Sequence, residues 1–432
     1  RATYEGYATK FEYNDKLGLI LIDQDGKQLA NAPFTYSAVG WTNDNTTYYS
    51  SKIDKIIAYF PYNAQLSQNV VTLDAVKQTI EIATDQSSLD KFKQTDLLAC
   101  EIEDPSPELN LQLKHVFSLM EFSATQQLEV EGETFNYNIA MSNVSFSIGE
   151  TMYTPCNLNG GYVCMIKDNS SLQKDDFRYF YTIEGKSNVK TLTTDKTITS
   201  GTKYTFPCPA AGMGEPNTLS AGDFYCTSTS DKVVILPSIA ATIPEGLTCK
   251  GIVFHVMDSN DSGSEWDTFL TNNQLAEANL PGYNGKHGLA VSLTTGKSLG
   301  IKNENKADIE SAYTTAGANA DLYQSKDALC GYILSKALLN SNTLTNIFTA
   351  LDNHKSENIA NTTGWYCPSY QELENLMNEL TIINQQMNIA QGEQITASPT
   401  LTYSDAGFWL IRPDLTDYNG DVTEAVRPIC AF

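Results

Sequence analysis

Histidine and carboxylate side chains, which carry most proton-transfer chemistry, form no recognisable catalytic arrangement in this sequence. His115 and His255 fall in apparent strands, and His287 lies at a turn that enters a strand, so structural roles are favoured. Acidic residues are abundant, but no spacing singles out a catalytic pair. The GxGxxG and GxxxxGKS/T phosphate-binding loops and the HExxH zinc motif are absent. We therefore predict no catalytic residues and no enzymatic activity.

Metal-binding chemistry is equally hard to find. The His and Cys positions show no zinc-like spacing. Glu215-Pro216-Asn217 spells a tripeptide associated with calcium in C-type lectins, but the nearest Trp-Asp pair, Trp266-Asp267, lacks the Asn found between Trp and Asp there. Calcium prefers about six to eight oxygen ligands, which this fragment does not assemble. We predict no metal site and no cofactor.

Aromatic side chains indicate a different chemistry, the binding of sugars. The chain has 23 Tyr and 4 Trp. Rings can stack on the C–H faces of a sugar while neighbouring polar groups bind its hydroxyls. Trp266, beside Glu265 and Asp267, and Tyr283, beside Asn284, are therefore the candidate ligand-binding residues. Most Tyr and Trp side chains serve cores or interfaces, so burial is the alternative for both.

The nine cysteines are an odd number, so at least one is unpaired within the chain. Cys156 and Cys164 flank a turn at Gly160-Gly161 and could bridge the two strands of a hairpin. Cys249, Cys367 and Cys430 stand where an apolar side chain would fit, which favours buried free thiols.

Composition limits the class of protein. The 432 residues are 41% hydrophobic, but no stretch approaches the roughly 18 apolar residues of a membrane span. The formal charge of −23 disfavours nucleic acid and anionic lipid as partners. Only 18% of the residues are charged, which suits exposed sheets of secreted proteins. The sequence opens at Arg1 without a signal peptide, so we expect either a cytosolic protein or one whose export signal was removed.

The pattern along the chain predicts three domains, at residues 1–111, 112–215 and 216–432. In the first, buried strands are predicted at Leu17–Ile22 and Ile56–Tyr62, the latter stopped by Pro61. Short strands with turn signals continue through the second to Phe206, as in a β-sandwich. Residues 208–217, rich in Gly, Ala and Pro, are a predicted linker.

The third predicted domain has a mixed α+β pattern. Strands are expected at residues 252–257 and 288–293, and helical periodicity at 327–339. A second helix follows Pro368, with Leu373, Leu376, Met377 and Leu380 at helical spacing and Ser369 as its cap. Two strands, at 407–411 and 425–432, are predicted at the end.

Several of these stretches resemble a known family in their order. Ile57–Tyr62, Thr95–Ala99, Leu111–Phe117 and Lys196–Phe206 resemble the fimbrillin family, the subunits and accessory subunits of type V pili of Bacteroides-like bacteria. Gly222–Tyr225, Cys249–Phe254, Gly364–Ser369 and Val426–Phe432 resemble a C-type-lectin-like module that is often fused to fimbrillins. Cys367 and Cys430 depart from that module but keep an apolar side chain.

The resemblance implies a mainly β fold, with two N-terminal transthyretin-like β-sandwich domains followed by an α+β C-type-lectin-like domain. It also implies a lipoprotein precursor that is carried to the outer membrane, touches the membrane only through its lipid anchor, and is trimmed by a protease that often cuts after Arg. Other pilus subunits are the implied partners, joined by β-strand addition. Tyr4, Tyr7 and Phe11 are the candidate strand-exchange residues, because they alternate in Arg1–Tyr13, a possible exchangeable strand or its start.

A tip or accessory adhesin is the expected role, since a folded C-terminal domain would hinder donation of a C-terminal strand. Its ligands would be host or bacterial surface glycans or proteins. One alternative is an outer-membrane lipoprotein that binds glycans without polymerising. A remote alternative is an oxidase of the formylglycine-generating type, because a related lectin-like fold carries such enzymes.

Overall fold

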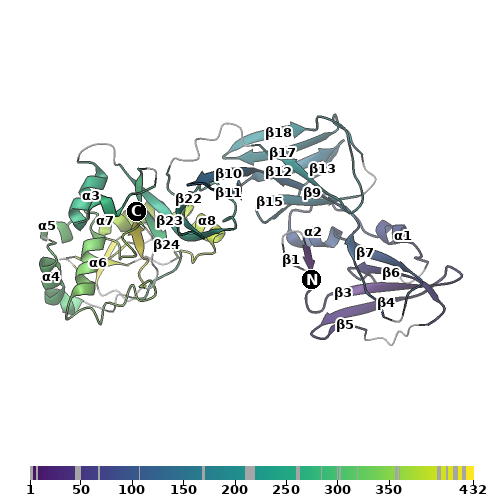
Figure 1. Ribbon diagram of the computed structural model, residues 1–432, viewed down its shortest axis with the longest axis horizontal. Coiled ribbons are helices and arrows are strands. Elements are labelled where there is room, and N and C mark those ends of the chain that lie inside the picture. The colour runs from purple at the N-terminus through teal and green to yellow at the C-terminus, as the bar shows by residue number, and fades with distance from the viewer. Residues whose placement is uncertain are drawn as a thin grey trace. The chain divides into compact units, whose positions relative to one another are not determined.

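The computed structural model divides the chain into two compact units (Figure 1). Unit 1 consists of residues 1–125 and 138–211, and unit 2 consists of residues 126–137 and 212–432. The structure describes residues 3–5, 8–43, 50–66, 69–106, 108–167, 171–209, 219–258, 263–283, 285–298, 300, 303–318, 320–355, 359, 361–396, 400–404, 407–411, 417–420 and 425–432. Tyr7 and most of the predicted linker, residues 210–217, lie outside the described residues.

The first sheet of unit 1 has six strands in the order β5-β4-β3-β6-β7-β8, and all neighbours are antiparallel. The strands are β3 (Lys16–Asp23), β4 (Gln28–Ser37), β5 (Gly40–Thr42), β6 (Ile53–Phe60), β7 (Leu98–Glu103) and β8 (Lys114–His115). β3 and β6 confirm the two buried strands predicted from sequence, and β6 ends immediately before Pro61. Their side chains are apolar on both faces, so both faces of the sheet must be covered.

Two short helices connect β6 to β7. They are α1 (Leu73–Gln78) and α2 (Leu89–Thr95). Thr72 and Ser88 cap them, since each side-chain oxygen accepts a hydrogen bond from the backbone N–H three residues later. Ahead of the sheet, β1 (Thr3–Glu5) pairs with β2 (Ala8–Lys10) as a separate two-stranded hairpin.

The rest of unit 1 consists of two four-stranded sheets and one small strand pair. Their orders are β13-β12-β17-β18 and β14-β15-β9-β20, and β16 pairs with β19. The strands are β9 (Ser118–Ser123), β12 (Ser142–Ile148), β13 (Thr151–Tyr153), β14 (Cys156–Leu158), β15 (Gly161–Ile166), β16 (Ser171–Leu172), β17 (Phe177–Ile183), β18 (Lys186–Thr191), β19 (Lys196–Thr197) and β20 (Lys203–Pro207). The ring of Phe122 on β9 stacks on that of Phe146 on β12, with centroids 5.2 Å apart, so the two sheets share an aromatic core.

One core joins the six-stranded sheet to the β14-β15-β9-β20 sheet. Ile20 and Ile57 of the first sheet belong to the same buried cluster as Val163 and Met165 of β15. The buried Gln86 side chain bonds both backbone groups of Met165, each at 2.8 Å. A buried amide needs such partners, and here they tie the α1–α2 connection to β15.

The main sheet of unit 2 has five antiparallel strands in the order β22-β21-β23-β24-β28. These are β21 (Phe224–Ser228), β22 (Val233–Leu236), β23 (Leu247–Met257), β24 (His287–Ser292) and β28 (Ile429–Ala431). A further sheet contains β25 (Thr400–Ser404), β26 (Gly407–Ile411) and β27 (Asp417–Gly420). The strands predicted at 252–257, 288–293, 407–411 and near the end of the chain are confirmed.

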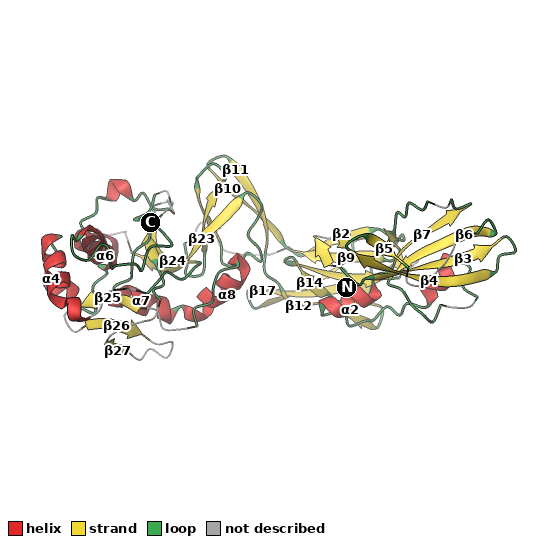
Figure 2. Ribbon diagram, turned by 90° about the horizontal axis from the view of Figure 1, so that it is seen from below, coloured by secondary structure: helices red, strands yellow, loops and turns green. Residues whose placement is uncertain are grey.

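Helices are concentrated in unit 2 (Figure 2). They are α3 (Glu265–Asn273), α4 (Lys306–Thr315), α5 (Ala320–Tyr323), α6 (Gly331–Asn340), α7 (Tyr370–Asn378) and α8 (Leu380–Ala390), with 3-10 turns η1 (Glu277–Asn279) and η2 (Asn303–Asn305). α7 begins directly after Ser369, as predicted, and the Glu372 carboxylate accepts the Ser369 backbone N–H at 2.7 Å. No described helix has the length and apolar character required to cross a membrane. Unit 2 is thus a mixed α+β unit, and its lectin-like fold stays a prediction.

A hairpin from the middle of the sequence also belongs to unit 2. It consists of β10 (Thr125–Val130) and β11 (Glu133–Asn138), and residues 126–137 cluster with the C-terminal residues. Lys232 lies against its turn, with Nζ 3.2 Å from a carboxylate oxygen of Glu133 and donating to the Glu131 carbonyl at 2.8 Å. The segment therefore falls within predicted domain 112–215 in sequence but within unit 2 in space.

Candidate functional site

The six-stranded sheet has a second apolar face, opposite the core that it shares with β15. Leu17, Leu19 and Leu21 point to this face, whereas Ile20 and Ile22 point to the shared core. Side chains alternate along a strand, so the continuous apolar run of β3 supplies both faces. Ala32, Ile53, Ile56 and Ala58 complete the buried part of this face. We call this surface the outer face.

The cover over the outer face is not a complete second layer. Leu111 and Leu113 pack on it half-buried, and Leu109 remains 36% exposed. Residues 109–113 form no strand, although their leucines alternate as strand residues do. Beneath them the Cys100 thiol bonds the backbone of Gln112, and burial raises the pKa of Cys100.

A groove remains between this segment and strands β3, β4 and β5. Its volume is about 590 Å³. The lining is mainly apolar, with Gln112 and His115 as its polar members, and consists of Phe11, Leu17, Leu19, Phe34, Trp41, Leu98, Leu109, Leu111, Gln112, Leu113 and His115. We call this cavity the outer groove. Its shape and chemistry suit apolar side chains more than a sugar or a charged ligand.

Phe11 is the one strand-exchange candidate whose side chain the structure describes. Its ring lies 5.1 Å from those of both Trp41 and Phe60, in edge-to-face geometry. Phe11 lines the outer groove, and its role in strand exchange stays a prediction. Tyr4 lies in β1, and the described structure extends only to its backbone, whereas Tyr7 falls outside the described residues.

The sheet also has backbone edges beside the groove. β5 pairs with β4 only at residues 35–37, and β8 pairs with β7 only at Leu98 and Ala99. Within the described part of the chain, β4 from 28 to 34 and β7 from 100 to 103 have no outer strand partner. An unpaired edge next to an apolar groove is the arrangement that accepts an added strand.

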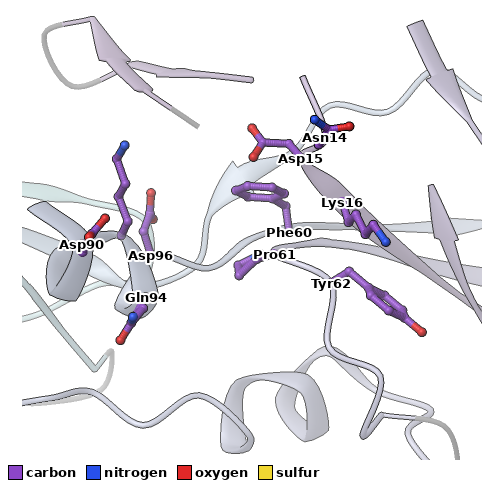
Figure 3. A pocket seen from close by; sticks show the side chains of 10 residues that line it. Asn14, Asp15, Lys16, Phe60, Pro61, Tyr62, Asp90, Gln94 and Asp96 are labelled. Atoms are coloured by element: carbon purple, nitrogen blue, oxygen red, sulfur yellow. The ribbon is translucent and has the colours of Figure 1, made fainter. Parts of the chain in front are cut away.

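A smaller pocket of about 280 Å³ lies at the start of β3 (Figure 3). Phe60 and Pro61 form its apolar wall, while Asp90, Gln94 and Asp96 reach it from α2 and the residue after it. Lys16, Lys93 and Asp15 also line it, so both signs of charge are present. This mixture does not select one class of ligand.

The two predicted sugar-binding aromatics are core residues. Trp266 is 2% exposed and stacks on the imidazole of His287, with centroids 3.9 Å apart and planes 5° from parallel. Tyr283 is 7% exposed and belongs to a buried cluster with Tyr225 and Phe432. Sugar stacking needs an exposed ring face, which burial denies to both rings. The structure thus favours the alternative of a core role.

Sequence reasoning missed one motif match, because Gly296-Lys297-Ser298-Leu299-Gly300 fits the GxSxG pattern of nucleophile elbows. An elbow requires a sharp turn between strand and helix, with a histidine beside the serine. Ser298 instead forms a backbone bridge with Ala425. The described structure shows no histidine hydrogen-bonded to Ser298, and the nearby His354 contacts Ser292 and Thr294.

The described residues also contain no group of three or more side chains that could together bind a metal ion.

Cys156 and Cys164, which could have bridged a hairpin, are not bonded in this structure. Cys156 lies directly opposite Val163 in the β14–β15 pair and shares the unit 1 core with it. Cys164 is the next residue on β15, so its side chain points to the other face. All nine cysteines are free thiols in the structure.

Comparisons with known proteins found similarity over the first 208 residues in one case and over nearly the whole chain in another. Residues 1–208 match the family described as fimbrillin-like. A fimbrial protein from Bacteroides ovatus ATCC 8483 is 19% identical, with 99% of this chain and 95% of that chain covered and a TM-score of 0.41. A fimbrial assembly protein from Parabacteroides distasonis ATCC 8503 is 11% identical, with 52% and 92% covered and a TM-score of 0.28. No curated protein matches the sequence.

Proposed function

We propose, because residues 1–208 are fimbrillin-like, that this chain is a cell-surface fimbrial subunit that accepts a strand from a partner subunit in its outer groove. The observation that carries the proposal is the groove itself, an apolar cavity of about 590 Å³ beside unpaired strand edges. A monomeric β-protein normally covers such an edge. A subunit that polymerises by strand addition must leave it accessible.

The physical basis is the match between a strand and this site. A donor strand would place alternate side chains into the groove and leave the others outside, because its side chains alternate. Each large apolar side chain buried there contributes roughly 1.5–3 kcal/mol. Backbone hydrogen bonds to the β4 or β7 edge would fix the register. Phe34, Trp41 and the leucines of 109–113 are the neighbours that such a strand would contact, and the segment that carries Phe11 is the part that would give way to it.

Strand β28 is held within the fold of unit 2, which argues against β28 itself as a donated strand. β28 pairs with β24, and Val426, Ile429 and Phe432 are at most 1% exposed. Withdrawing this strand would expose the core of unit 2. We propose a position at a fibre tip or another accessory position, with unit 2 presenting the adhesive surface to a glycan or protein. Export as a lipoprotein to the outer membrane is part of the same proposal.

The two alternative functions would require different features of the structure. A glycan-binding lipoprotein that never polymerises would have no use for the outer groove and would not co-purify with fibres. An oxidase of the formylglycine-generating type would need a reactive thiol. Burial raises the pKa of Cys330, Cys367 and Cys430, which makes them poor nucleophiles.

The test introduces one charge at two places in unit 1. Phe34→Lys puts the charge into the groove, and Val189→Lys, at a side chain that is 56% exposed on β18, is the matched control. In cells that make the partner subunits, Phe34→Lys should lose co-purification with fibres while Val189→Lys keeps it. Phe34→Ala serves where the charged variant fails to fold. Folded groove variants that join fibres as the unmodified protein does would refute the proposal.

A further inference from the structure

Two cysteines that are distant in sequence face each other in unit 2. Cys226 on β21 is the direct antiparallel partner of Cys249 on β23. A register shift after Tyr225 creates this match. Tyr225 pairs with Gly251 and the next residue, Cys226, pairs with Cys249, so Lys250 is an extra residue on β23. In the strand pairs described for this chain, no other two cysteines are register partners.

The geometry suits a covalent bond. Directly opposed residues of an antiparallel pair have Cα atoms about 4.5–5.5 Å apart, and disulfides span roughly 4.4–6.8 Å. Their side chains point to the same face of the sheet, because directly opposed residues of an antiparallel pair share a face. Closing the bond therefore needs no large movement of either strand.

Access to the two sulfurs differs. Cys226 is fully buried, whereas Cys249 is half-buried and its thiol donates to the Gly251 carbonyl at 3.4 Å. An oxidant from solvent can therefore reach Cys249 first. Cys226 is placed to attack from the inner side.

We propose that Cys226 and Cys249 form an intrachain disulfide when the folded chain meets a disulfide oxidant. The Cys249 thiolate attacks one sulfur of the oxidant, forming a mixed disulfide and releasing one thiol. Burial raises the pKa of Cys226, so the second step is the slow one. Cys226 attacks the Cys249 sulfur within the fold, and its proton passes to the departing sulfur of the oxidant, which leaves as the second thiol. Two protein thiols are oxidised, and one oxidant disulfide is reduced to two thiols.

The bond would close a loop that contains β22 and would fasten β21 to the long strand β23. Disulfides stabilise mainly by restricting the unfolded chain, so the gain belongs to unit 2. A bond buried at the Cys226 end would also resist reduction by small thiols, because a reductant reaches only one of its sulfurs.

The test uses the full chain and oxidised glutathione as the oxidant, so it does not depend on where the protein resides. After oxidation the protein is denatured in excess alkylating reagent and digested with trypsin without reduction. Lys232 lies between the two cysteines, so their peptides separate unless they are linked. We expect one linked pair, about 2 Da lighter than the two free-thiol peptides together. Cys208 lies on the same tryptic peptide as Cys226. Fragment spectra of the linked pair are therefore needed to show which of these two cysteines is bonded to Cys249.

Cys156 and Cys164 are the matched control, close across a turn but not register partners, and both should be alkylated. Alkylation of both Cys226 and Cys249, or linkage of either to another cysteine, would overturn the proposal. A second readout is the melting temperature of unit 2, which reduction should lower by several degrees in the oxidised protein. Cys249→Ser, at a half-buried site, should abolish this difference, and a difference that persists in a folded Cys249→Ser variant also overturns the proposal.

Discussion

The carboxylate of Asp96 lies 2.7 Å from the Nδ1 atom of His115. Asp96 follows α2 and is 4% exposed, and His115 lies on β8. Next to this pair, the Val116 N–H donates to the Leu97 carbonyl at 2.8 Å. The two interactions together hold the chain in place where it enters β9. Burial by itself would lower the pKa of His115, but the hydrogen bond and charge of Asp96 outweigh it, and the pKa is raised.

This raised pKa gives stability a defined pH dependence. A protonated His115 stabilises the fold fully below its unfolded pKa of about 6.5, and the effect is lost as pH rises through the higher folded value. We expect His115→Gln to lower the free energy of unfolding of unit 1 by roughly 1.5–3 kcal/mol at pH 6 and by less at pH 8. Urea titrations across this range measure the gap. A gap that stays constant with pH would contradict the assignment.

Glu372 makes the opposite prediction for unit 2. It is fully buried at the start of α7, and burial raises its pKa to about 7 against the hydrogen bond from Ser369. The folded state therefore holds a proton that the unfolded state releases above about pH 4.3, so this group's contribution to stability falls as pH rises to about 7.

Glu372→Gln keeps an acceptor for the Ser369 N–H but cannot ionise. Relative to the variant, the unmodified protein should lose of the order of 3 kcal/mol between pH 4.5 and pH 8. Denaturant unfolding of unit 2 at several pH values measures this difference. Equal destabilisation by the variant at both ends of the range would show that folding does not shift the pKa of Glu372, and the assignment would be wrong.

Trp266 should behave as a core residue. Trp266→Ala removes the ring that stacks on His287 and Phe269 and should destabilise unit 2 by roughly 3–5 kcal/mol. Trp266→Phe keeps an aromatic ring, and the buried indole N–H has no hydrogen-bond partner among the described residues, so its effect should be clearly smaller. Thermal unfolding compares the two variants. If Trp266→Phe abolishes glycan binding without changing stability, the ring contacts ligand and the core role is wrong.

Deletion of residues 426–432 tests the accepting role from the other end of the chain. Val426, Ile429 and Phe432 are buried, and each loss should remove roughly 1.5–3 kcal/mol from unit 2. We expect a misfolded or insoluble C-terminal unit, measured by circular dichroism and solubility. A truncated protein that stays folded and soluble but no longer joins fibres would identify the strand as a donor and refute the tip position.

Local physics was sufficient for many of the elements. The apolar run at Leu17–Ile22 and the strand that ends before Pro61 were predictable, because burial pattern and proline act over a few residues. The helix after Pro368 was predictable for the same reason, since its cap and its leucine spacing lie within three turns. Alternation along the N-terminal segment, together with the family resemblance, singled out Phe11, which lies at the outer groove but whose role in strand exchange stays a prediction.

Tertiary structure decided what depends on long-range pairing. Cys156 and Cys164 are close in sequence, yet alternation across β15 separates their side chains, while a register shift brings Cys226 opposite Cys249. A shift of one residue turns every later side chain to the other face, and no local pattern reports such a shift. Burial of Trp266 was likewise undetermined by sequence, because Trp266 lies on helix α3 and the residue that stacks on its ring, His287, lies on strand β24.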